Sequence, residues 1–265
     1  MARDARIFSG SVDLLASALP TFRLDVQYTR LASALADEGL ATILLKGPAF
    51  DQLLFNGSRR RAYSDIDLLV EPRQVDQAER LIEQLGFDRV ARRPLAAFGW
   101  QLGIAVGLLD PSHATAWVRD RDRFTVDLHR TLPLVGASGE EVWRALAAHR
   151  VTITVVGSEV ETLDRAASAL VIAVHAAHHG PSWRRARTDL ERACEVLERD
   201  CWHAAMRLAR DLRAARAMGI GLGTTPAGRA IADELGLRTE PTLAYRLTWP
   251  VIAWIDRRRT TMRGL

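Results

Sequence analysis

Hydrophobic residues recur at helical spacing in two segments of the N-terminal half. In residues 22–38 one stripe precedes Gly39, and its members are Leu24, Tyr28, Leu31 and Leu35. Between Pro72 and Gly86 runs a second stripe of Val75, Ala78, Leu81, Ile82 and Leu85. Apolar residues three and four apart share one face of a helix, and glycine is common just past a helix end. Both segments are therefore predicted to be amphipathic helices.

Short apolar runs between and after these helices predict strands. ATILL (41–45) and SDIDLLV (64–70) are rich in the branched residues that favour strands. Between them, PAFDQLLF begins with Pro48, which suits the first turn of a helix because its missing N–H has no helical partner there. Further along, ATAWV and RFTVDLHRTL flank the charged turn RDRD and predict a hairpin.

The pattern changes near residues 150–165. VTITVVGSEVETL predicts a last strand pair with Gly157 in its turn, and from residue 164 the pattern is helical, with breaks at HHGPS and MGIGLGTTP. Residues 90–113 show no readable pattern. We therefore predict an α+β protein with two domains: a mixed α/β domain over residues 1–160 and a helical bundle over residues 161–265.

Composition adds few constraints. Apolar residues make up 48% and charged residues 26% of the 265, with a net charge of +4, as in globular proteins. There is neither the long apolar stretch of a membrane span nor the basic-then-apolar order of a secretory signal at the N-terminus. Cys194 and Cys201 are predicted on one helical stripe, too far apart to form a disulfide bond. We expect a cytoplasmic protein with no membrane partner.

The candidate chemistry begins with three aspartates. Asp65 and Asp67 are two residues apart in a predicted strand, so their side chains point to the same face. Asp127 lies in the middle of FTVDLHRTL, where an unpaired charge would be costly. If the two strands are neighbours, three carboxylates converge on one site, and carboxylates are the ligands Mg²⁺ prefers. The alternative is an ordinary acidic pair at the edge of a sheet.

The only lysine among 36 basic residues, Lys46, stands beside Gly47 at the end of the first predicted strand. Lysine is a compact point charge on a flexible stem, whereas arginine is a planar fork, so the two do not replace each other. A lone lysine ahead of the acidic pair indicates a role in the chemistry. Lys-Gly, the acidic pair and the later Asp127, in that order, favour nucleotide phosphates with a divalent metal.

LLKGPAF, R-x-x-S-D-I-D-L-L-V and V-D-L-H together resemble a known family. The chain is similar to the nucleotidyltransferases related to DNA polymerase beta. More narrowly it resembles uncharacterised bacterial members often encoded near ribosomal-peptide (lasso peptide) maturation genes. The resemblance covers roughly residues 20–200 and implies a small mixed sheet flanked by helices, followed by a helical bundle. The usual Gly-Ser or Gly-Gly of the phosphate turn is Lys46-Gly47-Pro48 here.

The resemblance also implies roles for the three acids and the first turn. Asp65 and Asp67 bind the Mg²⁺ or Mn²⁺ that carries the NTP, and Asp127 binds the catalytic metal and draws the proton from the acceptor. Gly47 lets the backbone approach the phosphates. Lys46 stabilises charge on the transferred or departing phosphate, and a salt bridge to the acids is the alternative.

Three more residues are placed at the nucleotide by position. Arg61 lies four residues before Asp65, and its fork suits a phosphate. Ser64 either bonds to phosphate or starts the strand. His129 follows Asp127 by two residues and so faces the same side of the strand, where it orients Asp127, contacts base or acceptor, or shuttles protons. A half-buried histidine at a strand end is the alternative.

A histidine cluster ends the first predicted C-terminal helix. His175 and His179 are four residues apart beside His178 and Gly180. That spacing suits a shared metal, but no third ligand is evident, and cationic histidine is favoured at a helix C-terminus anyway. The family resemblance, which includes this histidine motif followed by a helix with an aspartate, here Asp189, implies a role at the domain interface.

The leading hypothesis is therefore a metal-dependent nucleotidyltransferase. It moves a nucleoside monophosphate from an NTP, ATP among them, to a peptide, protein or small-molecule acceptor. One alternative is a toxin-type transferase acting on tRNA or protein. Nucleic acid is not the favoured partner, because the arginine clusters suit a solvated surface better than a groove. The other alternative is an inactive nucleotide-binding module. The three aspartates argue against it, because an inactive site would not need to keep carboxylates that repel one another.

Overall fold

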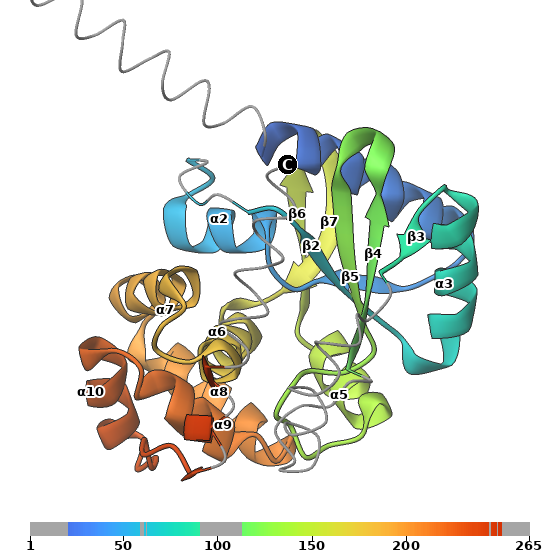
Figure 1. Cartoon of the computed structure of the whole chain (residues 1–265). Coiled ribbons are helices and arrows are strands. Elements are labelled where there is room, and N and C mark those ends of the chain that lie inside the picture. The colour runs from blue at the N-terminus through green and yellow to red at the C-terminus, as the bar shows by residue number, and fades with distance from the viewer. Residues whose placement is uncertain are drawn as a thin grey trace, which may run out of the picture.

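The computed structural model describes residues 21–58, 61, 63–90, 113–243, 245–247 and 249–250. Most of the unreadable stretch 90–113 lies outside these residues. An N-terminal helix over residues 21–37 leads into a mixed sheet, and a group of helices follows (Figure 1). The α+β prediction, with a mixed sheet flanked by helices and then a helical bundle, is confirmed.

Seven strands form one sheet in the order β3-β4-β5-β2-β1-β7-β6. Their bounds are β1 Thr42–Leu44, β2 Ile66–Val70, β3 Asp88–Arg89, β4 Ala114–Arg119, β5 Phe124–His129, β6 Arg150–Val155 and β7 Ser158–Leu163. Strand β2 runs antiparallel to β1 and parallel to β5. The hairpins β4–β5 and β6–β7 confirm the two predicted from sequence. The neighbouring β2 and β5 bring the acidic segments together.

Ten further elements complete the described fold. The helices of the first part are α2 Pro48–Phe55, α3 Val75–Gln84 and α5 Gly139–Ala147, with short 3₁₀ turns η1 Pro72–Gln74 and η2 Asp120–Asp122. Those of the second part are α6 Arg165–His179, α7 Arg184–Val196, α8 Arg199–Asp211, α9 Ala215–Leu222 and α10 Pro226–Glu234. The sequence analysis did not predict α5, although its capping box between Ser138 and Glu141 is a recognisable start signal.

Alternating residues of β2 face two different cores. Ile66 and Leu68 pack with Tyr28 and Leu35 of the N-terminal helix and with Ile82 of α3. Leu69 packs in a second cluster with α5 and the helices of the C-terminal part. Because strand residues alternate in direction, Asp67 lies on the same face as Leu69. The candidate site is therefore on the face of the sheet that meets α6.

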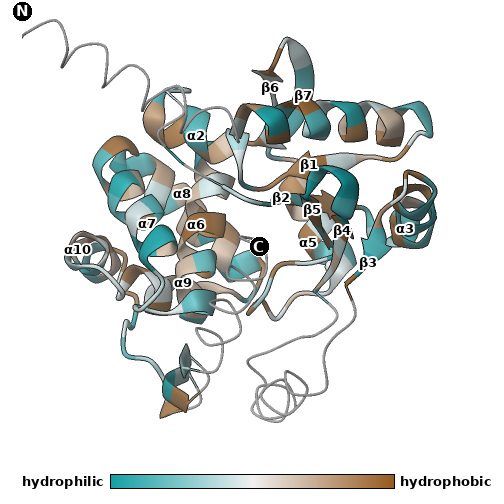
Figure 2. Ribbon diagram, turned by 45° about the horizontal axis from the view of Figure 1, so that its top comes forward, coloured by the Kyte–Doolittle hydropathy of each residue, from teal (hydrophilic) through white to brown (hydrophobic). Residues whose placement is uncertain are grey.

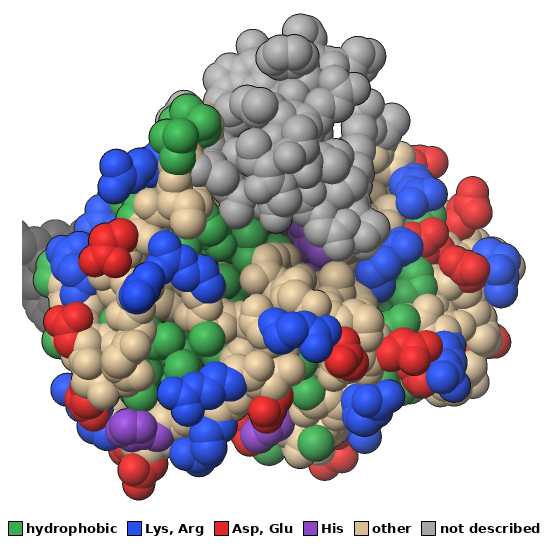
Figure 3. Space-filling model, turned by 90° about the horizontal axis from the view of Figure 1, so that it is seen from below, with side chains coloured by type: hydrophobic (Ala, Val, Ile, Leu, Met, Phe, Trp, Pro, Cys, Tyr) green, Lys and Arg blue, Asp and Glu red, His purple; other side chains and the backbone are tan. Residues whose placement is uncertain are grey.

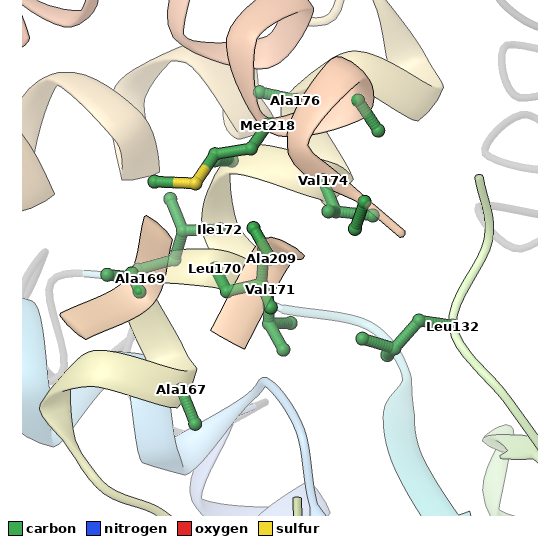
Figure 4. Close-up of a cluster of buried hydrophobic side chains, with 14 of the residues drawn as sticks. Leu132, Ala167, Ala169, Leu170, Val171, Ile172, Val174, Ala176, Ala209 and Met218 are labelled. Carbon is green, nitrogen blue, oxygen red and sulfur yellow. The ribbon is translucent and has the colours of Figure 1, made fainter. Parts of the chain in front are cut away.

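Helix α6 is the centre of the helical part. Ten of its residues are buried, and it is largely brown in Figure 2, while α3 carries both colours. Figure 4 shows its side chains in one cluster with Leu132, Ala209 of α8 and Met218 of α9. Burying apolar surface contributes roughly 25 cal/mol per Å², so a helix covered on all sides adds strongly to stability. This cluster also includes Ile43 of β1 and Leu45, which follows β1, so it joins the sheet to the helices.

Two details of the sequence analysis need correction. MGIGLGTTP was predicted to break the helices; the break is present but lies only between the end of α9 at Leu222 and the start of α10 at Pro226, because α9 continues through Gly219 and Gly221. A Cβ atom at Gly221 would lie 1.8 Å from the carbonyl oxygen of Ala173, so the glycine serves a close helix crossing with α6. The cysteines do not share one helix: Cys194 is on α7 and Cys201 on α8, and both are free and half-buried.

Two further observations concern the remaining predictions. Within the described part of the chain, no helix has both the length and the hydrophobicity to cross a membrane. The division into domains over residues 1–160 and 161–265 stays a prediction.

Candidate active site

The first turn after β1 holds Lys46 and Gly47 at the edge of the acidic face. The amide N–H of Leu45 still donates to the carbonyl of Asp67 at 2.9 Å, and there the chain leaves the sheet. Gly47 has φ +64° and ψ −123° and precedes α2, whose first residue is Pro48. A side chain would be strained at this positive φ. The turn therefore requires glycine and places the backbone beside Lys46.

Asp67 and Asp127 lie side by side on neighbouring strands. They are directly opposite in the parallel register of β2 and β5, so both carboxylates project from the same face. Asp67 is buried, while Asp65 and Asp127 are half-buried. Asp65 immediately precedes β2, beside the half-buried Ser64. The predicted neighbouring of the two acidic strands is confirmed.

Asp67 is held by two cationic or hydrogen-bonding side chains. Lys46 Nζ lies 2.6 Å and His129 Nε2 lies 3.0 Å from Asp67 Oδ1. Burial alone raises the pKa of Asp67, but the charge of Lys46 and the hydrogen bond from His129 hold it well below its usual range. Burial lowers the pKa of Lys46, yet Asp67, Asp65 and Asp127 together raise it above its ordinary value. The ammonium therefore stays charged beside the three acids.

The lowered pKa of Asp67 predicts a loss of stability in acid. The unfolded chain binds a proton at a pKa of about 3.9, whereas the folded carboxyl binds one only at lower pH. This contribution to the free energy of unfolding is thus fully present above about pH 4 and is lost as the pH falls toward the folded pKa. We expect urea midpoints, measured with a chelator present, to fall below about pH 4. Asp67→Asn should flatten that part of the profile, and an unchanged profile would contradict the assignment.

Arg61 is placed differently from the sequence prediction. Its Nε and Nη2 donate to the two carboxylate oxygens of Asp189 on α7, both at 2.8 Å, in a buried pair. Its backbone N–H donates to Asp51 of α2 at 3.2 Å. The guanidinium thus connects the segment before β2 to the helical part. Its Nη1 is buried without a hydrogen bond among the described residues. Phosphate binding by Arg61 stays a prediction.

The histidines predicted at the interface lie together at the end of α6. The rings of His175 and His179 are 4.5 Å apart, and those of His178 and His179 are 5.0 Å apart. His175 lies close enough to Lys46 and Arg61 for their charges to act on it, and Asp189 pairs with Arg61. A role of His175, His179 and Asp189 at a domain interface stays a prediction. Sequence reasoning missed His113, which lies just before β4. The centre of its ring is 5.7 Å from the ring centres of both His129 and His178. No spacing signal identifies His113, since only the fold brings it there.

The donor set has the chemistry of a divalent metal site. Carboxylate oxygens of Asp65, Asp67 and Asp127 are the hard ligands that Mg²⁺ takes. In the described part of the chain, no group of three or more His, Cys, Asp or Glu side chains has the arrangement of a metal site. Lys46 Nζ lies beside Asp67 and supplies positive charge there. The acids fit a metal by the chemistry of their oxygens.

The mixed sheet, with its acids on neighbouring strands and its helical partner, agrees with the nucleotidyltransferase class. The chain belongs to the family described as "Uncharacterised nucleotidyltransferase", whose model matches residues 13–227. This makes the protein an enzyme of that class. A search of the curated proteins finds no match.

A solved structure shows the same fold. It is the solution structure of the antibiotic-resistance factor ANT(2'')-Ia, described as having substrate-regulated conformation dynamics. The similarity has a TM-score of 0.50 at 17% sequence identity and covers 74% of this chain and 95% of that one. At this identity the comparison concerns the fold alone.

Proposed function

We propose that the protein transfers a nucleoside monophosphate from an NTP to a hydroxyl or phosphate acceptor and releases pyrophosphate, with Mg²⁺ or Mn²⁺ required. The observation that carries this proposal is the register of β2 and β5, which sets Asp67 directly beside Asp127 at the Lys46–Gly47 turn. The family match supports the reaction class.

Each residue has a proposed task. Asp65 and Asp67 hold the metal that accompanies the triphosphate, and this metal supplies charge stabilisation at the phosphate oxygens. Asp127 accepts the proton of the acceptor while the oxygen of the acceptor forms a bond to the α-phosphorus. The bond from the α-phosphorus to the bridging oxygen breaks, and pyrophosphate leaves with that oxygen. Lys46, which contacts Asp67 in the structure, offsets the charge on the departing group at a phosphate oxygen.

The remaining residues position the nucleotide. The Gly47 turn brings backbone close to the phosphates. His129, bonded to Asp67, orients that carboxylate toward its ligand. Ser64 and Arg61 extend the phosphate site from the segment before β2. We propose ATP as one of the nucleotides used, and a peptide, protein or small molecule of the cytoplasm as acceptor. Peptide natural-product maturation is the proposed setting.

Two other readings are decided by the same experiment. A toxin-type transferase would modify tRNA or protein, with Arg184, Arg185 and Arg187 of α7 as contacts to phosphates. Its RNA binding would weaken steeply with salt. An inactive nucleotide-binding module would bind NTP without transfer.

The test is label transfer from each of four α-phosphate-labelled NTPs with Mg²⁺ or Mn²⁺ and cell extract as acceptor source. We expect wild type to label an extract component and Asp65→Asn/Asp67→Asn to lose transfer by roughly 10³-fold or more, since metal stabilisation is worth several kcal/mol. Asp37→Asn, an exposed acid on the N-terminal helix, is the control. Equal, metal-independent NTP binding without transfer in both proteins would overturn the proposal. A labelled tRNA would identify the toxin.

A further inference from the structure

Five histidine rings form a continuous chain that begins at the acidic site. His129 of β5 bonds to Asp67, and its ring lies 5.7 Å from His113, which lies 5.7 Å from His178. His178 and His175 each contact His179, at 5.0 and 4.5 Å. These rings come from β5, the residue before β4 and the end of α6. In Figure 3, a histidine surface is visible in a depression near the centre of the face.

Buried nitrogen atoms without hydrogen bonds gather around this chain. In the part of the protein that the structure describes, they include Arg61 Nη1, His129 Nδ1, His175 Nδ1 and His178 Nδ1. Buried polar atoms are nearly always paired, so each exception calls for an explanation such as a ligand or ordered water. Four such nitrogens near one another, with Arg61 among the charges that act on His175, indicate a ligand that accepts hydrogen bonds.

The charges around His175 and His178 favour an anion. Burial lowers the pKa of both histidines far below the ordinary value, and neighbouring cations lower it further. Lys46 acts on both histidines, and Arg61 acts on His175. Two nearby carboxylates are already engaged, since Asp67 holds Lys46 and His129, and Asp189 holds Arg61. A group bearing negative charge would therefore meet nitrogen donors and the positive charges of Lys46 and Arg61.

Other occupants fit this place less well. A metal cation would add positive charge beside Arg61, whose carboxylate partner Asp189 is already engaged, and no metal-type cluster occurs among the described residues. A nucleobase needs an exposed ring face, but the ring pairs of the three α6 histidines meet edge to face at 75° and 87°. A phosphate group has several acceptor oxygens and matches guanidinium and imidazole donors.

We infer that Arg61, His175 and His178 form an anion subsite that binds a phosphate group beside the metal-binding acids. The inference rests on the proposed function, because it assigns a second phosphate position next to the site of transfer. Arg61 Nη1 and the imidazole N–H groups donate to the phosphate oxygens. The phosphate comes either from the β and γ positions of the NTP, and so from the departing pyrophosphate, or from a phosphorylated acceptor.

The first experiment titrates the full chain with inorganic pyrophosphate in the presence of a chelator, followed by calorimetry. Losing one hydrogen bond to a charged group should weaken binding by about 10- to 100-fold, so His175→Leu and His178→Leu are expected to do so. His178→Asn keeps an amide nitrogen near the position of Nδ1 and should restore most of the affinity. His203→Leu, on the exposed side of α8, is the matched control and should bind like wild type.

A second measurement works even where a leucine variant folds poorly. In wild type with isotope-labelled histidine, pyrophosphate should shift the imidazole resonances assigned to His175 and His178 and leave that of His203 unchanged. Absence of these shifts, or equal weakening by His203→Leu, would overturn the subsite.

Two controls separate the sources and the parent proposal. Competition between pyrophosphate and a non-hydrolysable NTP assigns the subsite to the β and γ phosphates, whereas simultaneous binding assigns it to the acceptor. Asp65→Asn/Asp67→Asn should lose transfer but keep pyrophosphate binding. Histidine-dependent pyrophosphate binding in a wild-type protein that shows no label transfer would retain the subsite and reject the transferase. Label transfer by a protein whose pyrophosphate binding does not depend on His175 and His178 would retain the transferase and reject the subsite.

Discussion

Asp127→Asn should lower kcat for nucleotidyl transfer by roughly 10²- to 10⁴-fold, the range that a positioned general base contributes. The substitution keeps the size and the strand register of the side chain. It removes the charge and the proton acceptor that we assign to the acceptor hydroxyl. KM for the NTP should change little, because Asp65, Asp67 and the Lys46–Gly47 turn still hold the triphosphate in the proposed arrangement.

Steady-state kinetics with a fixed acceptor measure this split between kcat and KM. Asp120→Asn is a matched control, since Asp120 is exposed and lies in the turn of the same hairpin. A raised KM with unchanged kcat would assign Asp127 to substrate binding instead. Activity within a few-fold of wild type would remove Asp127 from the reaction altogether.

Asp189→Leu should lower the free energy of unfolding by about 3–5 kcal/mol, because it leaves the guanidinium of Arg61 buried without its partner. The pair is bidentate at 2.8 Å, and both side chains are almost fully covered, with 6% and 2% exposure. Burial lowers the pKa of Arg61, and Asp189 raises it above its ordinary value. Arginine stays charged in proteins, so the cost appears as lost stability.

Urea unfolding of wild type and three variants tests this pair. The double variant Arg61→Met/Asp189→Leu should recover much of the loss, since apolar residues of similar size often replace a buried pair without cost. Glu195→Ala breaks an exposed ion pair with Arg192 on the same helix and should cost about 0–1 kcal/mol. If Asp189→Leu costs no more than Glu195→Ala, the buried pair does not connect the two parts of the fold.

The pair also bears on activity, because Arg61 precedes the acidic strand. It fixes the segment before β2 to α7, while its backbone N–H is held by Asp51 of α2. The position of Asp65 relative to the helical part therefore depends on this contact. Asp189 on α7 therefore influences the acidic site indirectly, because it helps to position the segment that precedes β2.

The spacing of apolar residues was sufficient to predict a helix or strand where one face of that element is buried. The N-terminal helix, β2 and the two hairpins were predicted because their apolar residues repeat at the spacing of the element. It failed at MGIGL, where Gly219 and Gly221 belong to a helix. The small size of Gly221 serves contact with α6 at Ala173, and that of Gly219 serves contact with the backbone of Arg238. Contact between segments distant in sequence leaves no local pattern.

The candidate site divides in the same way. The D-x-D pair, Asp127, Lys46 and Gly47 were identified from residue type and order, because a short strand and a glycine turn are local structures. The pairing of Arg61 with Asp189 was not foreseen, and neither was His113 beside His129 and His178. These contacts join residues far apart in the chain.

The sequence by itself determined most of the elements of the sheet part other than α5, the acidic motif and the family, since each depends on short spacings and residue chemistry. Only the tertiary structure decided that Asp67 faces Asp127, that Lys46 neutralises it, and that α6 brings three histidines to the same face. The physical reason is that strand order and helix packing follow from burying two separate cores. That burial depends on the whole chain and on no single segment.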